Sequence, residues 1–157
     1  MRIRNAVLAA VVALIATPVA LAGVVIQGGG PKLATVHAAG LRSAALHGHV
    51  RSLVWTDRTG RTRRETVPVD LNLDSAATLL PPPGEWTDLT LVLDGPVTLT
   101  GTTLAGAPTR LSADLGAWTV PLEAPGSAPL ILDLALPAGL SSPADLAVAL
   151  QDGALAR

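Results

Sequence analysis

Leucine and valine recur at every second position along much of this chain, and that alternation most limits how it can fold. In the segment 86–94, Leu89, Leu91 and Leu93 are separated by Thr90 and Val92. A period of two places such side chains on one face of a β-strand. We predict about seven strands, with turns between them, because this spacing is typical of an all-β fold built as a single β-sandwich. The predicted strands are 46–56, 62–73, 86–94, 97–104, 110–115, 117–122 and 130–136.

Alternation also assigns side chains to faces and marks the turns. One face of the strand 46–56 carries Val50, Ser52, Val54 and Thr56, and the other carries His47, His49, Arg51, Leu53 and Trp55. The segment 57–61 contains Gly60 and is predicted to be a hairpin turn into the strand 62–73. In that strand the apolar residues Val67, Val69, Leu71 and Leu73 occupy alternate positions, so they are expected to face inward. Asp94-Gly95 is predicted to be another turn, at which the strand 86–94 ends.

The N-terminus has the three parts of a secretory signal. Arg2 and Arg4 precede an apolar run over 6–16, and Ala20-Leu21-Ala22 supplies the small residues that a signal peptidase requires. We therefore predict a signal peptide over 1–22 and an exported protein, periplasmic or extracellular. The alternative is an uncleaved anchor that reaches Ile26, since 6–26 is long enough to span a bilayer; the protein would then be anchored in the inner membrane.

The rest of the chain divides into three parts. Residues 23–32 contain Gly28-Gly29-Gly30 and are predicted to be a flexible linker. Residues 33–140 form the predicted β-sandwich, and 141–157 form a C-terminal helix or tail. Ser142 is a good helix N-cap, Pro143 suits the first turn, and Gly153 suits the end of the helix.

Composition removes several classes of site. The 157 residues include no Cys, so disulfides, thiolate metal sites and lipid attachment through an N-terminal Cys are excluded. There is no Phe or Tyr, and Trp55, Trp86 and Trp118 are expected in the core. Residues 23–64 carry seven basic groups and one acid, whereas 65–157 carry two basic groups and eleven acids. The two parts either meet within one fold or make a polar molecule that self-associates or docks on an anionic surface.

The stretch 80–93, Leu-Pro-Pro-Pro-Gly-Glu-Trp-Thr-Asp-Leu-Thr-Leu-Val-Leu, resembles bacterial exported domains of unknown function. In those domains a turn with leucine, proline, glycine and an aromatic residue enters an alternating strand of a prealbumin-like or carboxypeptidase-regulatory-like β-sandwich. The segment 69–73 before it fits the same pattern, so the resemblance covers about 25 residues. It implies a β-sandwich of prealbumin-like or immunoglobulin-like type and an envelope location, and it implies no activity. Many members carry a lipidated Cys that this chain lacks.

Two groups of residues are candidate metal ligands. His47-Gly48-His49 places two imidazoles on one face of a strand, and a third ligand such as His37 or Asp57 would complete a zinc site. The alternative is two polar side chains on the wet face of a strand. Asp70, Asn72 and Asp74 project oxygen atoms that suit calcium, although the pattern does not match a helix–loop–helix calcium motif. The alternative is the outer face of an amphipathic strand.

Four arginines gather in the predicted hairpin 57–64. Arg58, Arg61, Arg63 and Arg64 would contact phosphate, lipid headgroups or an acidic polymer, or would simply be solvated. Nucleic acid is not expected, because no aromatic residues lie among these arginines and the net charge of the chain is −1.

No pattern of residues indicates an enzyme. The chain has no Cys and no Gly-x-Ser-x-Gly sequence, and its three His all lie between positions 37 and 49. We expect an exported β-sandwich with a non-enzymatic structural or protein-interaction role in the cell envelope, and no required cofactor. Its partner would be another envelope protein or a second copy, and it would touch the membrane only through an uncleaved N-terminal segment. The alternative is a weak module for calcium, zinc or another ligand.

Overall fold

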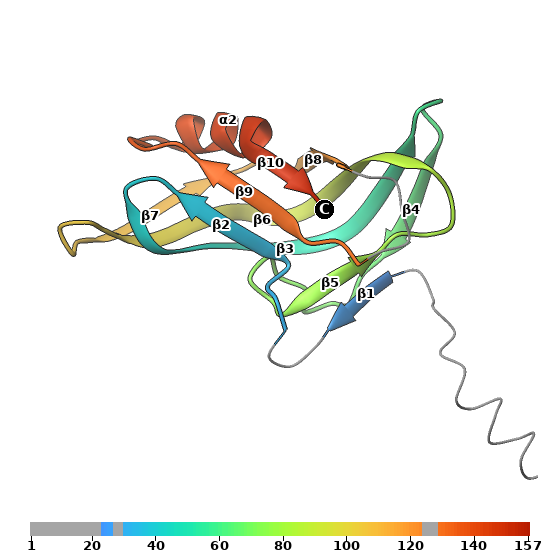
Figure 1. Ribbon diagram of the computed structural model, residues 1–157, viewed down its shortest axis with the longest axis horizontal. Coiled ribbons are helices and arrows are strands. Elements are labelled where there is room, and N and C mark those ends of the chain that lie inside the picture. The colour runs from blue at the N-terminus through green and yellow to red at the C-terminus, as the bar shows by residue number, and fades with distance from the viewer. Residues whose placement is uncertain (1–22, 27–29, 124–128) are drawn as a thin grey trace, which may run out of the picture.

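Two long antiparallel strands, β3 (Leu41–Asp57) and β6 (Trp86–Thr103), lie side by side through the length of the fold (Figure 1). They are seen in a computed structural model that describes residues 23–26, 30–123 and 129–157. The fold is all-β and sandwich-like, with several sheets and a short C-terminal helix, as the alternation predicts.

Three shorter strands complete the larger sheet. β4 (Thr62–Thr66) pairs with the outer edge of β3, next to the end of that strand. β7 (Pro108–Ala113) and β8 (Ala117–Pro121) pair in turn with the outer edge of β6. The two long strands therefore form the centre of the larger sheet, and each of its three shorter strands pairs with one of them.

A smaller sheet forms the second layer. β9 (Leu132–Leu136) lies between β2 (Ala34–Ala38), which is parallel to it, and β10 (Ala154–Ala156), which is antiparallel. In Figure 1 this sheet lies in front of β3 and β6. Helix α2 (Pro143–Gly153) follows β9 and packs against β7, β8 and β9.

Backbone contacts join the two layers at both sides. Leu122, just after β8, bridges to Ala156 in β10. On the other side, the N–H of Ala34 donates to the carbonyl of Leu73, at 2.8 Å. These contacts pair backbone groups that would otherwise lie on open sheet edges.

Leucine fills the space between the layers. Leu89, Leu91 and Leu93 of β6 are buried, as the alternation predicts. Trp55 and Trp118 are also fully buried, whereas Trp86 is partly buried against the core. This confirms the expected core position of Trp55 and Trp118, whereas Trp86 lies at the margin of the core. The indole N–H groups of both buried residues have acceptors, the carboxylate of Glu65 for Trp55 and the carbonyl of Leu150 for Trp118, so no polar atom of either ring is left unpaired.

The predicted faces of β3 are wrong beyond Arg51. Val50 points into the core, and so do Leu53 and Trp55. In a regular strand, residues three or five positions away from Val50 would lie on the opposite face. Val50 pairs with Leu93 and Ser52 pairs with Val92, so Arg51 is an extra residue in β3. Such a bulge switches which positions face inward, and a strict period of two cannot show it.

The predicted turn at Asp94-Gly95 is also wrong, because β6 continues through it. His49 pairs with Asp94 and His47 pairs with Thr98, so two steps along β3 match four along β6. Gly95 has a φ of 88°, a value that costs glycine little. The Asp-Gly pair therefore makes an irregularity within one strand of 18 residues.

The predicted strand 62–73 ends early, at Thr66. Val69 is 83% exposed instead of inward, and the N–H of Leu71 donates to the carbonyl of Pro68 in a turn. Proline has no N–H for a strand ladder, which explains why pairing stops before it. Leu71 and Leu73 are nevertheless fully buried, as predicted.

The N-terminal predictions have mixed outcomes. The predicted signal peptide over 1–22 lies outside the described residues. Within the predicted linker 23–32, Gly23–Ile26 forms strand β1, which pairs with β5 (Ala77–Leu80). In the part of the chain that the structure describes, no helix has the length and apolarity to cross a membrane.

The C-terminal helix begins and ends where the sequence predicts. Ser142 is the N-cap, and its hydroxyl accepts a hydrogen bond from the N–H of Asp145. The carboxylate of Asp145 in turn accepts from the N–H of Ser142, which completes a capping box. The helix ends at Gly153, which is not among the residues with a positive φ. A Cβ at this position would collide with the carbonyl oxygen of Ala135 in β9.

We predict that Gly153→Ala destabilises the fold by about 1–3 kcal/mol, the usual cost of forcing atoms into a filled space. The obstacle is backbone, which cannot rotate away. Urea unfolding followed by tryptophan fluorescence measures the change. Gln151→Ala, at an exposed position of the same helix, is the control and should change stability by less than about 0.5 kcal/mol. Equal stability of Gly153→Ala and the native chain would contradict the observed packing of α2 on β9.

Two carboxylates should make the fold sensitive to acid. The carboxylate of Asp57 accepts hydrogen bonds from Thr59, and the bond from the Thr59 hydroxyl does most to hold the pKa of Asp57 below its ordinary value. The side chain of Ser142, followed by Ser141, does the same for the pKa of Asp145. A carboxyl whose pKa is lower in the folded chain stabilises it above about 3.9, the usual value for the unfolded chain. This contribution disappears as the pH falls through the lowered pKa.

We therefore expect Asp145→Asn to lose less stability than the native chain when the pH falls from about 7 to about 3. Urea midpoints at the two pH values provide the measurement. Asp152→Asn, which removes a carboxylate from the last turn of the same helix, is the control and should keep the native pH dependence. An unchanged pH dependence in Asp145→Asn would show that the capping box does not contribute in this way.

Candidate functional site

The structure brings His47 and Asp74 together with a threonine on the outer face of the larger sheet. His49 bridges to Asn72, so the next outward pair in that antiparallel register is His47 with Asp74. The Nδ1 atom of His47 lies 3.0 Å from Oδ2 of Asp74, and its Nε2 atom lies 3.0 Å from Oγ1 of Thr100. We call these three side chains the polar row. The imidazole is 44% exposed and the carboxylate 35% exposed.

The other predicted metal ligands do not join this row. Nε2 of His49 contacts the carbonyl oxygen of Val69, and its Nδ1 is buried without a partner in the described structure. The side chain of Asn72 donates to the backbone carbonyl of Asp70, and Asp70 itself is exposed. The carboxamide of Asn72 is therefore directed to the backbone of Asp70 and not to an imidazole.

The two further ligands that the sequence suggested lie elsewhere. His37 is in β2 of the smaller sheet, 3.7 Å from Asp133, and Asp57 is at the end of β3. Over residues 23–26, 30–123 and 129–157, no three His, Asp or Glu side chains come close enough to hold a metal ion. The zinc and calcium hypotheses therefore gain no support from this geometry.

The polar row has the order hydroxyl, imidazole, carboxylate that activates a nucleophile in many hydrolases. Catalysis would also require free N–H donors beside the hydroxyl to stabilise an oxyanion. Thr100 lies in a central strand, paired with Ala45 on one side and Arg110 on the other. The backbone around it therefore belongs to the strand ladders, and we interpret the row as a set of contacts that holds the segment around Asp74 against β3.

We name residues 57–64, between β3 and β4, the arginine hairpin. The carboxylate of Asp57 accepts hydrogen bonds from the N–H groups of Thr59 and Arg61 and from the Thr59 hydroxyl, which fixes the turn. The four arginine side chains of this hairpin are exposed; they are Arg58, Arg61, Arg63 and Arg64. The structure thus groups these four residues as the sequence predicts.

Two of the four arginines have acidic neighbours. Arg58 lies 3.2 Å from Glu85, with both side chains largely exposed, and Arg63 lies 3.6 Å from Glu65. Exposed pairs of this kind contribute little stability. Glu65 is also the acceptor for the indole of Trp55, so its carboxylate is directed towards the core side of the hairpin.

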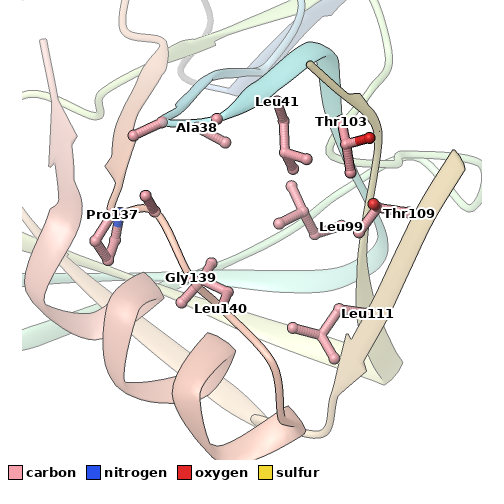
Figure 2. A pocket seen from close by; sticks show the side chains of 12 residues that line it. Ala38, Leu41, Leu99, Thr103, Thr109, Leu111, Pro137, Gly139 and Leu140 are labelled. Carbon is pink, nitrogen blue, oxygen red and sulfur yellow. The ribbon is translucent and has the colours of Figure 1, made fainter. Parts of the chain in front are cut away.

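An apolar pocket lies at the opposite end of β3 and β6, where the sequence indicated no site (Figure 2). Its volume is about 240 Å³, and the hydroxyls of Thr103 and Thr109 are the only polar side-chain groups in its lining. Figure 2 shows the side chains of Leu41, Leu99 and Leu111 around the space. The complete lining is Ala38, Ala39, Gly40, Leu41, Leu99, Thr103, Thr109, Leu111, Pro137, Ala138, Gly139 and Leu140.

Three connections meet around this pocket: the turn from β2 to β3, the hairpin from β6 to β7, and the link from β9 to α2. In the hairpin, Gly106 has a φ of 88°, and its N–H donates to the carbonyl of Thr103. The signal in the sequence was the apolar composition of these connections, such as Pro137-Ala138-Gly139-Leu140. Connections are usually polar, so apolar ones that converge indicate a contact surface.

A second, more open depression shares the wall formed by residues 137–140. Its volume is about 790 Å³, and its lining includes Val148, Asp145 and Asp152 of α2. Val148 is 57% exposed, and Leu104, next to Thr103 in the β6–β7 hairpin, is 65% exposed. Two of the three large apolar side chains exposed in the described residues thus lie at this end.

Comparisons with protein-family models, with curated proteins and with solved structures found no match to this chain. The resemblance of the segment 80–93 to prealbumin-like exported domains therefore stays a prediction, and the function must be argued from the geometry.

If the polar row is structural, His47→Ala should destabilise the fold by about 1 kcal/mol, since both hydrogen bonds of a half-exposed imidazole are lost. His37→Ala is the matched control, because its side chain is 73% exposed; it should cost less than about 0.5 kcal/mol. Urea unfolding of the two variants provides the comparison. A cost for His37→Ala that equals the cost for His47→Ala would remove the structural role of the row.

Proposed function

We propose that this chain is exported to the cell envelope and binds a partner protein there through the apolar pocket, without catalysing a reaction. The observation that carries this proposal is the apolar surface at the end of the sandwich where β3 begins and β6 ends. A pocket with no charged lining residue, the exposed Leu104 and the exposed Val148 all occur there. Exposed apolar surface next to a preformed hollow is typical of a protein-binding site.

The size of the pocket favours a partner's side chain over a small-molecule ligand. Sites for drug-sized ligands usually measure about 300–1,000 Å³, and this pocket measures about 240 Å³. It suits one or two apolar side chains inserted as anchors, the arrangement that dominates the energy of many interfaces. Asp145 and Asp152, beside the neighbouring depression, favour a basic rim on the partner.

Export is supported by the N-terminal sequence, with its basic residues, apolar run and small residues in order. The absence of Cys means that the domain depends on its core alone outside the cell. A non-enzymatic role is supported by the polar row, whose threonine lies inside a strand that is paired on both sides.

A photo-crosslinking amino acid at Ala138, on the rim of the pocket, should form a specific adduct in cells that produce the full chain. Thr109→Trp in the same protein should reduce this adduct about tenfold or more, which corresponds to a loss of about 1.4 kcal/mol or more of binding free energy. Thr109 faces the pocket in Figure 2, so a tryptophan there would fill the space that the partner needs.

Thr66 in β4 supplies the controls, because it is exposed and distant from the pocket. A crosslinker at Thr66 should not give the same adduct, and Thr66→Trp should leave the Ala138 adduct unchanged. Melting temperatures establish that both tryptophan variants are folded. Identical adducts from both positions, or an adduct unaffected by Thr109→Trp, would contradict the proposal. An adduct with the mass of two chains would identify a second copy as the partner.

A further inference from the structure

We propose that the arginine hairpin docks end-on against anionic phospholipid headgroups, at the surface of the membrane across which the chain is exported. This inference rests on the export part of the proposed function and does not depend on the pocket. It assigns a binding surface to the end of the molecule that lies opposite the partner site.

The charges of the hairpin are arranged to leave cationic groups free. Asp57 directs its carboxylate into the turn, where it accepts three hydrogen bonds, and Glu65 accepts from the buried Trp55. Arg61 and Arg64 are exposed and form no ion pair within the described residues, although the charge of Arg61 helps to lower the pKa of the nearby Asp57. Guanidinium groups bind phosphate oxygens in a bidentate manner, so these side chains suit phospholipid headgroups.

The arginines surround the hairpin instead of covering one flat face. Arg63 pairs with the inward-facing Trp55, whereas Arg64 pairs with Val54, so the two lie on opposite faces of β4. Arg58 and Arg61 lie in the turn itself. This distribution suits contact of the hairpin tip with a planar surface, in which all four side chains can reach the headgroups.

The described part of the chain begins at the end of the molecule that carries the arginine hairpin. Gly23, the first residue after the predicted leader, pairs with Leu80 at the end of β5. Five residues further along the chain, Glu85 lies 3.2 Å from Arg58, and five residues span at most about 18 Å. In Figure 1 the start of β1 and the β3–β4 hairpin both lie on the right of the molecule. The segment that meets the membrane during export thus joins the domain on the arginine side.

A few arginines alone hold a protein to a membrane only weakly, and stable attachment takes a second signal. The leader would supply that signal if it stays attached, and the hairpin would then fix the orientation. Along β3 the pocket lies at Leu41 and the hairpin begins at Asp57. Docking by the hairpin would therefore direct the pocket away from the membrane, towards a partner.

The absence of Cys allows a direct test in the full chain. Thr62→Cys, at the exposed start of β4 in the arginine hairpin, carries one environment-sensitive fluorophore, and Ala105→Cys in the β6–β7 hairpin carries the same fluorophore in a second preparation. Each is mixed with vesicles of phosphatidylcholine alone or of phosphatidylcholine with phosphatidylglycerol. We expect the label at residue 62 to brighten and shift to the blue only with phosphatidylglycerol, and the label at residue 105 not to respond. Raising the salt from about 0.1 M to about 1 M should reverse the response, because the Debye length falls from about 10 Å to about 3 Å.

Charge variants test which arginines are responsible. Arg61→Gln with Arg64→Gln should abolish the response of the label at residue 62. Arg42→Gln with Arg110→Gln removes the same charge from exposed positions near the pocket end and should leave the response intact. These controls also separate the two proposals, since loss of lipid binding would leave the Ala138 crosslink unaffected.

Several results would overturn the inference. They are an equal response to both kinds of vesicle, a response of the label at residue 105 instead of residue 62, and equal losses from the two pairs of glutamine variants. Competition by millimolar inorganic phosphate at constant ionic strength would indicate a site for free phosphate and would also overturn membrane docking.

Discussion

The pairing of β3 with β6 is the interaction on which the rest of the structure depends. These strands of 17 and 18 residues form the centre of the larger sheet, and β4, β7 and β8 each pair with one of them. Their inward positions supply Leu53, Trp55, Leu89 and Leu91 to the core. Each fully buried leucine contributes about 1.5–3 kcal/mol relative to an exposed one, so a core of this kind can hold the fold without disulfides.

The irregularities in this pair determine what each end of the molecule presents. The bulge at Arg51 turns Leu53 and Trp55 inward, and the irregularity at Gly95 lets β6 continue to Thr103. One end of the pair therefore carries the arginine hairpin, and the other carries three apolar connections around a pocket. The proposed membrane contact and the proposed partner contact both depend on this separation, because a strand pair fixes the distance between its ends.

Local signals in the sequence predicted much of the fold. The segments 117–122 and 130–136 match β8 and β9, and Ser142 and Gly153 mark the helix, since a cap and a close approach involve only a few neighbouring residues. Gly95 was predicted to be in a turn because Asp-Gly suits both a hairpin and an irregular strand, and only the partner strand decides between them.

The sequence does not predict the short strands β1, β2, β5 and β10, for a related reason. Each is paired through contacts distant in sequence, such as β1 with β5, and has too few residues to show a period of two. For the candidate sites, the sequence grouped the four arginines because they are adjacent, and it named His47 and Asp74 without linking them. The pocket could not be predicted, since its lining comes from four separate parts of the chain.

The central claim is that β3 and β6 stay paired from one end to the other, across their local irregularities, and hold the two ends of the molecule apart. Double electron–electron resonance between spin labels on Thr62→Cys and Ala105→Cys tests this directly, because the chain has no other Cys. Sixteen steps of strand, from Leu41 to Asp57, predict a separation of roughly 50 Å at about 3.3 Å per residue. A hairpin at Asp94-Gly95 would fold β6 back on itself, and a separation below about 30 Å would contradict the account.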